Sequence, residues 1–175
     1  MAVITSKLVI FDLDETLIHA TKTPLDSQED QRYSDYYVYH RPGLEKFLIE
    51  CSRLFSLAIW SSADDTYVKS IAQALLPTGV APQFIWGRSE CWVKQMRKRY
   101  DTSNLESKVY QNIKPLEKIR RMGFSMENLL IVDNSLYKVE DNPGNYVIIK
   151  PFVGNPQDTE LKGLLRALSN FINSK

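Results

Sequence analysis

The stretch KLVIFDLDETLIHA, from Lys7 to Ala20, constrains the fold more than any other part of the chain. Its apolar run does not alternate with polar residues, as expected of a strand buried on both faces of a parallel sheet. The run ends directly in Asp12 and Asp14, whose side chains point the same way in extended backbone. Two carboxylates so placed repel each other unless a cation or a proton offsets their charge. The stretch therefore predicts a buried sheet with a polar site at a strand end.

Short apolar runs alternate with helix-like periods along the rest of the chain. Runs of strand length occupy 55–60, 82–87, 128–134 and 145–150. Apolar residues recur with the spacing of one helix face in 41–55, 61–79, 114–124 and 158–172. Strands separated by helices indicate βαβ units, so we expect an α/β fold with a mostly parallel sheet and helices on both faces. The length of 175 residues suits one domain, covering 1–175.

Residues 20–40 interrupt this alternation soon after the first strand. They are polar and acidic and then aromatic, so we expect a small insertion that ends in a strand. The alternation of the aromatic residues predicts that they share one face of a small sheet, where they serve mainly in packing. These residues are Tyr33, Tyr36, Tyr37 and Tyr39.

Residues 87–112 form a second interruption, which is basic and lacks a clear period. We expect a loop-rich excursion in this segment. It contains the one basic run of the chain, KQMRKRY from Lys94 to Tyr100. Such a run is usually a solvated surface, and the alternative is a patch that attracts an acidic phosphoprotein or nucleic acid.

Composition narrows the classes of partner and compartment. The formal net charge is +1 and 25% of the residues are charged, which gives no broad electrostatic reason to expect nucleic acid or a membrane as partner. No apolar run is long enough to span a bilayer, and the N-terminal segment predicts a strand rather than a signal peptide. Cys51 and Cys91 match neither a disulfide framework nor a zinc motif. We therefore expect a monomer with reduced thiols in the cytoplasm, or in the nucleus of a eukaryote.

Polar side chains recur at two further strand ends. Asp133 and Asn134 follow the run LLIV, and Ser61 and Ser62 follow LAIW. Because the carboxyl ends of parallel strands share one edge of a sheet, these groups should meet the first two aspartates there. Ligands rich in oxygen suit Mg²⁺ better than zinc or copper, so the sequence predicts a magnesium site. The two histidines match no metal or acid–base spacing and are expected to be structural.

Four segments in order resemble the four motifs of the haloacid dehalogenase (HAD) superfamily. They are FDLDETL, WSSA, the lysine of KPLEKI, and IVDNS. HRPGLEKFL and GRSEC resemble elements of one branch, the protein phosphatases that act on the RNA polymerase II C-terminal domain, including the small and NLI-interacting-factor-like ones. The resemblance covers about Lys7 to Ile149. It implies a HAD-like, Rossmann-like fold and a Mg²⁺-dependent phosphatase that works through a phosphoaspartate.

The resemblance implies catalytic roles for two residues. Asp12 would be the nucleophile, since an aspartate is already ionised at pH 7 and needs no adjacent base. Asp14 would be the general acid for the poor leaving alkoxide and then the base for the attacking water. The neighbouring charge of Asp12 favours the protonated form that this role requires. Thr16 could bond near the site or serve only in the turn.

The resemblance also implies binding residues. The phosphoryl oxygens would be held by Ser61 and Lys114, with Ser62 as a rival that could instead cap the next helix. Arg88 would help to recruit substrate. The expected magnesium ligands are Asp12, the backbone carbonyl of Asp14, and Asn134, with Asp133 supporting them.

Three functions remain open at this point. The leading one is a phosphoserine or phosphothreonine protein phosphatase, because little sequence is available for a lid and an open site suits a large substrate. The second keeps the chemistry but acts on small phosphomonoesters or polynucleotide ends. The third is an inert interaction module on the same fold. The insertion is shorter and more acidic than that of the resembled small phosphatases, where it helps to form a pocket for a proline-bearing peptide.

Overall fold

The computed structural model describes residues 7–96 and 109–173. A five-stranded sheet in the order β10-β9-β1-β5-β6 forms its centre. All neighbouring strands in this sheet run parallel, so the predicted α/β class is confirmed. The strands are β1 (Leu8–Phe11), β5 (Ser56–Trp60), β6 (Ile85–Trp86), β9 (Leu129–Asp133) and β10 (Tyr146–Ile148).

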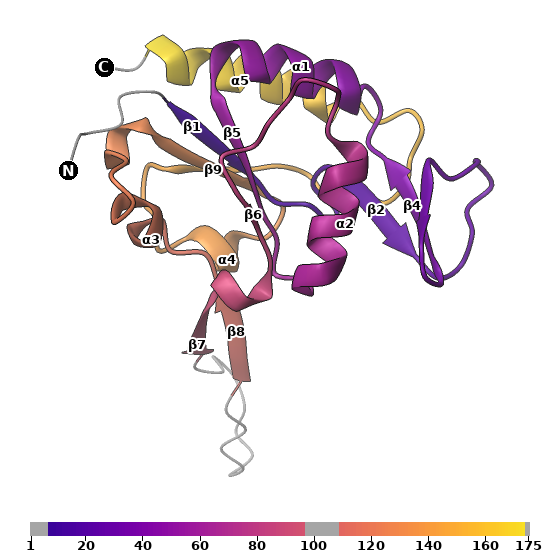
Figure 1. Ribbon diagram of the computed structural model, residues 1–175, viewed down its shortest axis with the longest axis horizontal. Coiled ribbons are helices and arrows are strands. Elements are labelled where there is room, and N and C mark those ends of the chain that lie inside the picture. Colours follow the sequence, from indigo (N-terminus) through magenta and orange to yellow (C-terminus); the bar gives the residue numbers. More distant parts are fainter. Residues whose placement is uncertain (1–6, 97–108, 174–175) are drawn as a thin grey trace.

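Helices cover both faces of this sheet, as expected (Figure 1). Three helices pack on one face, and two short ones pack on the other. The first set is α1 (Leu44–Leu54), α2 (Asp65–Leu75) and α5 (Glu160–Asn173). The second set is α3 (Glu117–Arg120) and α4 (Leu136–Val139).

The apolar run of β1 explains why both faces are covered. Leu8 and Ile10 join the core beneath α3 and α4. Val9 and Phe11 join the core beneath the three longer helices. Because alternate side chains point to opposite faces, a strand between two helical layers must be apolar throughout. Complete burial of each side chain contributes about 1.5–3 kcal/mol, which fixes this strand at the centre.

The insertion is a small antiparallel sheet, larger than the single strand expected at its end. Its strands are β2 (Ile18–Thr21), β3 (Gln31–Tyr33) and β4 (Tyr36–His40), in the order β2-β4-β3. A tight turn joins β3 to β4, with Ser34 at a φ of 52°. This turn creates the hairpin that was not expected from the polar residues before it.

The prediction that the four tyrosines share one face is wrong. Tyr33 pairs with Tyr36 across the hairpin, and both rings contact Tyr67 of α2. Tyr37 and Tyr39 alternate with Tyr36 along β4 and therefore point to the opposite face. The sequence prediction treated these tyrosines as one strand. The turn places them in two strands, so their spacing along the chain no longer tells which face each one occupies.

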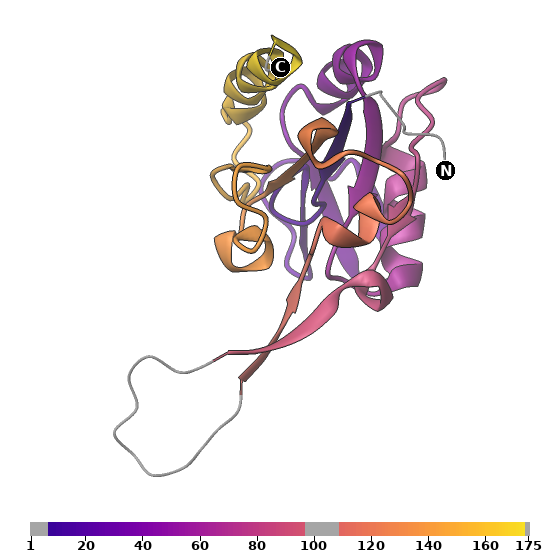
Figure 2. The same ribbon diagram turned by 90° about the vertical axis from the view of Figure 1, so that its left-hand side faces the viewer.

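The prediction of a loop-rich excursion at 87–112 is also wrong in its described part. β7 (Trp92–Met96) and β8 (Val109–Ile113) pair as an antiparallel ribbon. Figure 2 shows this ribbon projecting from the body of the molecule. A projecting ribbon has little core on either face, so it lacks the apolar period by which strands are recognised. Most of the basic run after Met96 lies outside the described residues.

Three smaller expectations can be placed on this fold. The N-terminus of α2 is capped by Asp64, which accepts hydrogen bonds from the N–H groups of Thr66 and Tyr67, so Ser62 is not the cap. Both cysteines are free thiols, and His19 and His40 lie in β2 and β4 of the insertion sheet. In the part of the chain that the structure describes, no helix combines the length and apolar character needed to cross a membrane.

Candidate active site

Three strand ends meet at one edge of the sheet, between the insertion sheet and the β7–β8 ribbon (Figure 1). The register pairs Phe11 with Ile59 on one side and with Val132 on the other. Asp12 follows in register, and its N–H donates to the carbonyl of Val132 over 2.9 Å. The residues that leave these strand ends as buried polar groups are Asp12, Ser61 and Asp133. The predicted convergence of the strand-end residues is thus present in the fold.

Lys114 lies between two of the carboxylates. Its Nζ is 2.5 Å from Oδ1 of Asp12 and 2.6 Å from Oδ2 of Asp133, and all three side chains are buried. Burial opposes the charge on Lys114, but the carboxylates of Asp12 and Asp133 outweigh it and raise the pKa of Lys114. Burial, together with the charge of Asp12, raises the pKa of Asp133. The ammonium therefore holds two like charges together at the edge of the sheet.

The backbone around Lys114 is equally constrained. Lys114 follows β8 directly, and its N–H donates to the carbonyl of Lys138 over 2.7 Å. Its own carbonyl accepts from the buried amide of Asn142 at 2.9 Å, and that amide also accepts from the N–H of Leu116. These bonds fix the backbone of Lys114, so its side chain extends from a defined position toward Asp12 and Asp133.

The turn after β1 orients the second oxygen of Asp12. Thr16 Oγ1 donates to Asp12 Oδ2 over 3.0 Å, so each oxygen of this carboxylate has its own donor. The carbonyl of Thr16 accepts from the guanidinium of Arg41, which is fully buried and pairs with both oxygens of Asp158. Arg41 was not singled out from the sequence, because its partners lie far from it along the chain.

Asp14 stands beside Asp12 and contacts two hydroxyl groups. Tyr67 OH donates to Asp14 Oδ1 over 2.5 Å, and Ser61 Oγ is 3.4 Å from Oδ2. Burial is the main cause that raises the pKa of Asp14, and the charge of Asp12 adds to it, while the hydrogen bond from Tyr67 opposes it. Tyr67 is a site residue that the sequence reading missed, since a tyrosine in the first turn of a helix gives no signal by itself.

The two serines after β5 occupy different positions. Ser61 is buried, its Oγ accepts from the N–H of Ala63 at 3.1 Å, and it faces Asp14. Ser62 is connected to the site through its backbone, since its carbonyl accepts from Arg88 Nε at 3.0 Å. Of the two hydroxyls, that of Ser61 therefore has the placement expected for a phosphate contact.

A pocket of about 400 Å³ opens beside Asp14, on the side of the insertion sheet. Arg88 is exposed at this pocket, where the resemblance expects a substrate-recruiting arginine. Tyr33 and Tyr36 belong to its lining, and both rings also pack against Tyr67. The full lining is Asp14, Ala20, Tyr33, Tyr36, Ala63, Asp64, Tyr67 and Arg88. The pocket combines aromatic surface with one cation next to the expected general acid.

The oxygen donors at this edge fit a magnesium ion. Asp133 bonds Lys114 through one oxygen and the N–H of Ser135, at 2.8 Å, through the other, so it anchors the turn that carries Asn134. Asn134 follows on the same strand end, half exposed, with its amide bonded to Glu15 and Ser135. Within residues 7–96 and 109–173, no three His, Cys, Asp or Glu side chains form a metal cluster. The expected set relies instead on an amide, a backbone carbonyl and one carboxylate, all oxygen donors.

Comparison with known proteins identifies the family of the chain. The pattern of the NLI interacting factor-like phosphatase family matches residues 7–175. The human carboxy-terminal domain RNA polymerase II polypeptide A small phosphatase 1 is 26% identical over 164 residues, which cover 90% of this chain and 56% of that protein. The human CTD small phosphatase-like protein is 26% identical over 166 residues, covering 91% of this chain and 54% of that protein. The chain thus spans about half the length of these relatives.

A solved structure of another protein has a similar fold. Fcp1, described as an essential RNA polymerase II CTD phosphatase, superposes with a TM-score of 0.58 at 21% identity, covering 96% of this chain and 48% of that one. This likeness confirms the HAD-like architecture that the motifs implied. With a family pattern that matches nearly the whole chain, the protein belongs to the NLI interacting factor-like phosphatases, the branch that includes the CTD phosphatases.

Proposed function

We propose that this chain is a Mg²⁺-dependent phosphomonoesterase that removes phosphate from phosphoserine or phosphothreonine in proteins through a phosphoaspartate on Asp12. The observation that carries this proposal is the set of groups that surround the Asp12 carboxylate. One of its oxygens meets Lys114 and the other meets Thr16, and Asp14 stands beside it. In this proposal Asp12 is the nucleophile, held in place next to Asp14 as the general acid. The names of the relatives, which are phosphatases, support the same reading.

In the first step, an oxygen of Asp12 attacks phosphorus and the bond to the serine or threonine oxygen breaks. The leaving oxygen takes the proton of Asp14, whose raised pKa favours the protonated form. Lys114 and the hydroxyl of Ser61 interact with the phosphoryl oxygens, so that an anion can approach an anion. The fixed geometry matters most here, because phosphoryl transfer depends on in-line positioning.

In the second step, water attacks the phosphoryl group on Asp12 and the acyl phosphate bond breaks. Asp14, now a carboxylate, takes the proton from this water. Phosphate leaves and both aspartates return to their starting states. The hydrogen bond from Tyr67 keeps Asp14 in one orientation through both steps.

The residues that would hold magnesium are Asp12, the backbone carbonyl of Asp14, and Asn134. When bound, the ion would offset the negative charge that the phosphate brings to the carboxylates. Asp133 would support this set, since it holds Lys114 through one oxygen and the N–H of Ser135, the residue after Asn134, through the other. Removal of divalent ions should therefore abolish turnover without unfolding the protein.

A protein substrate fits the surroundings of the site. The insertion is a sheet of three short strands beside the site, and the pocket next to Asp14 is open to solvent on the surface. Arg88 and the aromatic residues at this pocket offer contacts to residues that flank a phosphoserine. A small phosphomonoester would leave these contacts unused.

The decisive experiment is a substrate screen with and without Mg²⁺. We expect magnesium-dependent hydrolysis of p-nitrophenyl phosphate and higher kcat/KM on phosphoserine and phosphothreonine peptides. Asp12→Asn should lower all rates by about a thousandfold or more while the circular dichroism spectrum is retained. Higher kcat/KM on sugar phosphates or on phosphorylated oligonucleotide ends would favour the second function. No magnesium-dependent hydrolysis of any substrate would favour the inert module.

A further inference from the structure

The short helix α4 carries a lysine, Lys138, that the chemistry proposed above does not use. The helix begins two residues after Asn134, the expected magnesium ligand. It packs against β8, which leads to Lys114, and against β9, which ends in Asp133. In Figure 1 it lies beside the base of the β7–β8 ribbon. Helix α4 therefore lies next to two of the chain segments that bring charged groups to the candidate active site.

The backbone of Lys138 is fixed next to that of Lys114. The N–H of Lys138 donates to the carbonyl of Ser135 over 3.1 Å, and its own carbonyl accepts from the N–H of Lys114 over 2.7 Å. The next residue, Val139, is completely buried in the core beneath α3 and α4. The side chain of Lys138 is only half-buried, and its flexible four-carbon stem lets the ammonium move without a change in the backbone.

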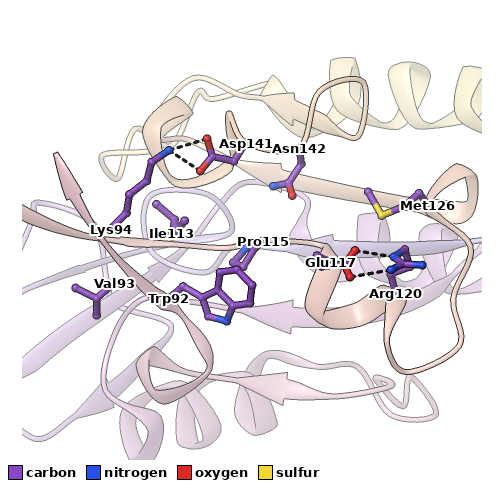
Figure 3. Close-up of a pocket in the computed structure, with 10 residues that line it drawn as sticks. All are labelled: Trp92, Val93, Lys94, Ile113, Pro115, Glu117, Arg120, Met126, Asp141 and Asn142. Carbon is purple, nitrogen blue, oxygen red and sulfur yellow. Dashed lines mark hydrogen bonds and ion pairs between the residues drawn. The ribbon is translucent and has the colours of Figure 1, made fainter. Parts of the chain in front are cut away.

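The ammonium of Lys138 differs from the other lysines on this side of the molecule. Within residues 7–96 and 109–173, it makes no hydrogen bond and no ion pair. Lys94 Nζ, in contrast, lies 2.7 and 2.6 Å from the two oxygens of Asp141 (Figure 3). Lys118 pairs with Glu90. A lysine without a partner usually extends fully into water, so a half-buried one beside a catalytic edge is a candidate for binding an anion.

The charge of Lys138 acts on groups at three strand ends. Burial raises the pKa of Asp14 and of Asp133, and the charge of Lys138 is one of the causes that oppose this rise at both. Burial also raises the pKa of Cys91, whose Sγ lies 3.9 Å from the carbonyl oxygen of Ser61, and Lys138 opposes this rise too. Because electrostatic interactions weaken with distance, a charge that affects all three groups lies close to the opening that they surround.

The buried groups of the site leave a need for a second cation. Asp12 and Asp133 share one lysine, Lys114, so the three together carry an excess negative charge. A phosphomonoester adds further negative charge. Lys114 also donates to both carboxylates, which leaves one of its three N–H groups for phosphate. The ammonium of Lys138 would offset the excess charge and supply additional donors.

We propose that Lys138 binds the phosphate group of the substrate as a second cation beside Lys114, with its ammonium donating to the phosphoryl oxygens. This inference rests on the proposed function, which brings a phosphomonoester to Asp12. All phosphomonoesters present the same oxygens, so the contribution of Lys138 does not depend on the rest of the substrate. It extends to free phosphate, the product of the reaction.

The test compares Lys138→Met with the wild type at one fixed concentration of Mg²⁺. We expect the inhibition constant of inorganic phosphate to rise about tenfold, and KM for p-nitrophenyl phosphate and for a phosphoserine peptide to rise equally, with kcat within about twofold. Lys138→Arg keeps the charge and should stay within about threefold of the wild type in each constant. Lys162→Met is the matched control, because Lys162 is exposed in α5, on the other face of the sheet.

Three outcomes would overturn the proposal. An inhibition constant for phosphate that is the same in Lys138→Met and Lys162→Met would show that Lys138 is a solvated surface lysine. A rise in KM confined to peptides with acidic residues beside the phosphoserine would mean that Lys138 recognises those residues and not the phosphate. A fall in kcat and in the free energy of unfolding in urea, with phosphate inhibition unchanged, would assign Lys138 to the packing of α4.

Equilibrium binding of inorganic phosphate, followed by phosphorus NMR, separates this inference from the catalytic proposal because it needs no turnover. The wild type and Lys162→Met should bind phosphate equally, and Lys138→Met about tenfold more weakly. Weaker binding to Lys138→Met in a chain that hydrolyses no substrate would support the role of Lys138 and overturn the proposed function. Hydrolysis by the wild type, with equal phosphate binding in all variants, would overturn the role of Lys138 and leave the function intact.

Discussion

The carboxyl edge of the sheet and the β7–β8 ribbon differ in which side chains they bury and which they expose. At the edge, charged groups are buried, and Asp12, Lys114 and Asp133 satisfy one another. On the ribbon, apolar groups such as Trp92 and Val93 are exposed. A buried charge is costly unless it is paired, so the edge is a rigid arrangement suited to chemistry. An exposed apolar surface gains only when something covers it, so the ribbon is suited to recognition.

The largest expected effect breaks the buried side of this comparison. Lys114→Met removes the cation between Asp12 and Asp133 and leaves two carboxylates buried together. We expect hydrolysis of p-nitrophenyl phosphate to fall by about a thousandfold or more, and the free energy of unfolding in urea to fall by roughly 3–5 kcal/mol. Lys118→Met is the control, because Lys118 is partly exposed and pairs with Glu90 at the surface. Similar losses of activity and of unfolding free energy in both variants would show that the effect does not depend on burial of the lysine.

The next effect concerns the buried arginine that holds the turn after β1. Asp158→Asn leaves the Arg41 guanidinium without its carboxylate, which should lower the free energy of unfolding by about 3 kcal/mol at pH 7. Although burial opposes it, the hydrogen bond from Arg41 leads the factors that lower the pKa of Asp158. A lowered pKa stabilises the fold above the unfolded value near 4, and this stabilisation is lost as the pH falls below it.

The difference between the wild type and Asp158→Asn should therefore shrink in acid, as measured by urea unfolding at several pH values. Asp35→Asn, which breaks the exposed pair of Lys22 and Asp35, should cost about 0.5 kcal/mol or less. A difference for Asp158→Asn that stays constant or grows toward low pH would contradict this assignment.

The smallest effect lies where the catalytic edge meets the insertion sheet. Tyr67→Phe removes the donor to Asp14 but keeps the ring against Tyr33. We expect kcat on a phosphoserine peptide to fall about tenfold, because its leaving group needs a proton from a well-oriented Asp14. The rate on p-nitrophenyl phosphate, whose leaving group needs little help, should fall by less than about threefold. Tyr36→Phe is the control, and equal losses on both substrates would assign Tyr67 to packing alone.

The sequence predicted the parts of the fold whose signals are local. The apolar run before Asp12 identified β1, and the same pattern before Asp133 and after α1 identified β9 and β5. Their order among helices then placed the polar strand ends at one edge. The lysine between the motifs came from the family resemblance rather than from a local pattern, since an isolated lysine is usually a surface residue.

Other parts could not be predicted because their partners lie far apart in the chain or outside any core. The ribbon has too little core to impose a period, so β7 and β8 were read as a loop. The hairpin in the insertion changed the phase of the tyrosines. Tyr67 reaches Asp14 across 53 residues of sequence, and Arg41 reaches Asp158 across 117.

The sequence by itself determined that a buried parallel sheet would present carboxylates, hydroxyls and an amide at the ends of its strands, because burial requires apolar runs and the runs end where polar residues begin. Only the tertiary structure decided which of these groups form hydrogen bonds or ion pairs with one another. It also decided which tyrosine orients Asp14 and where the β7–β8 ribbon lies relative to the site. The physical reason is range: hydrophobic periodicity is read from neighbours along the chain, whereas hydrogen bonds and ion pairs at a site depend on distances of a few ångströms between residues that only folding brings together.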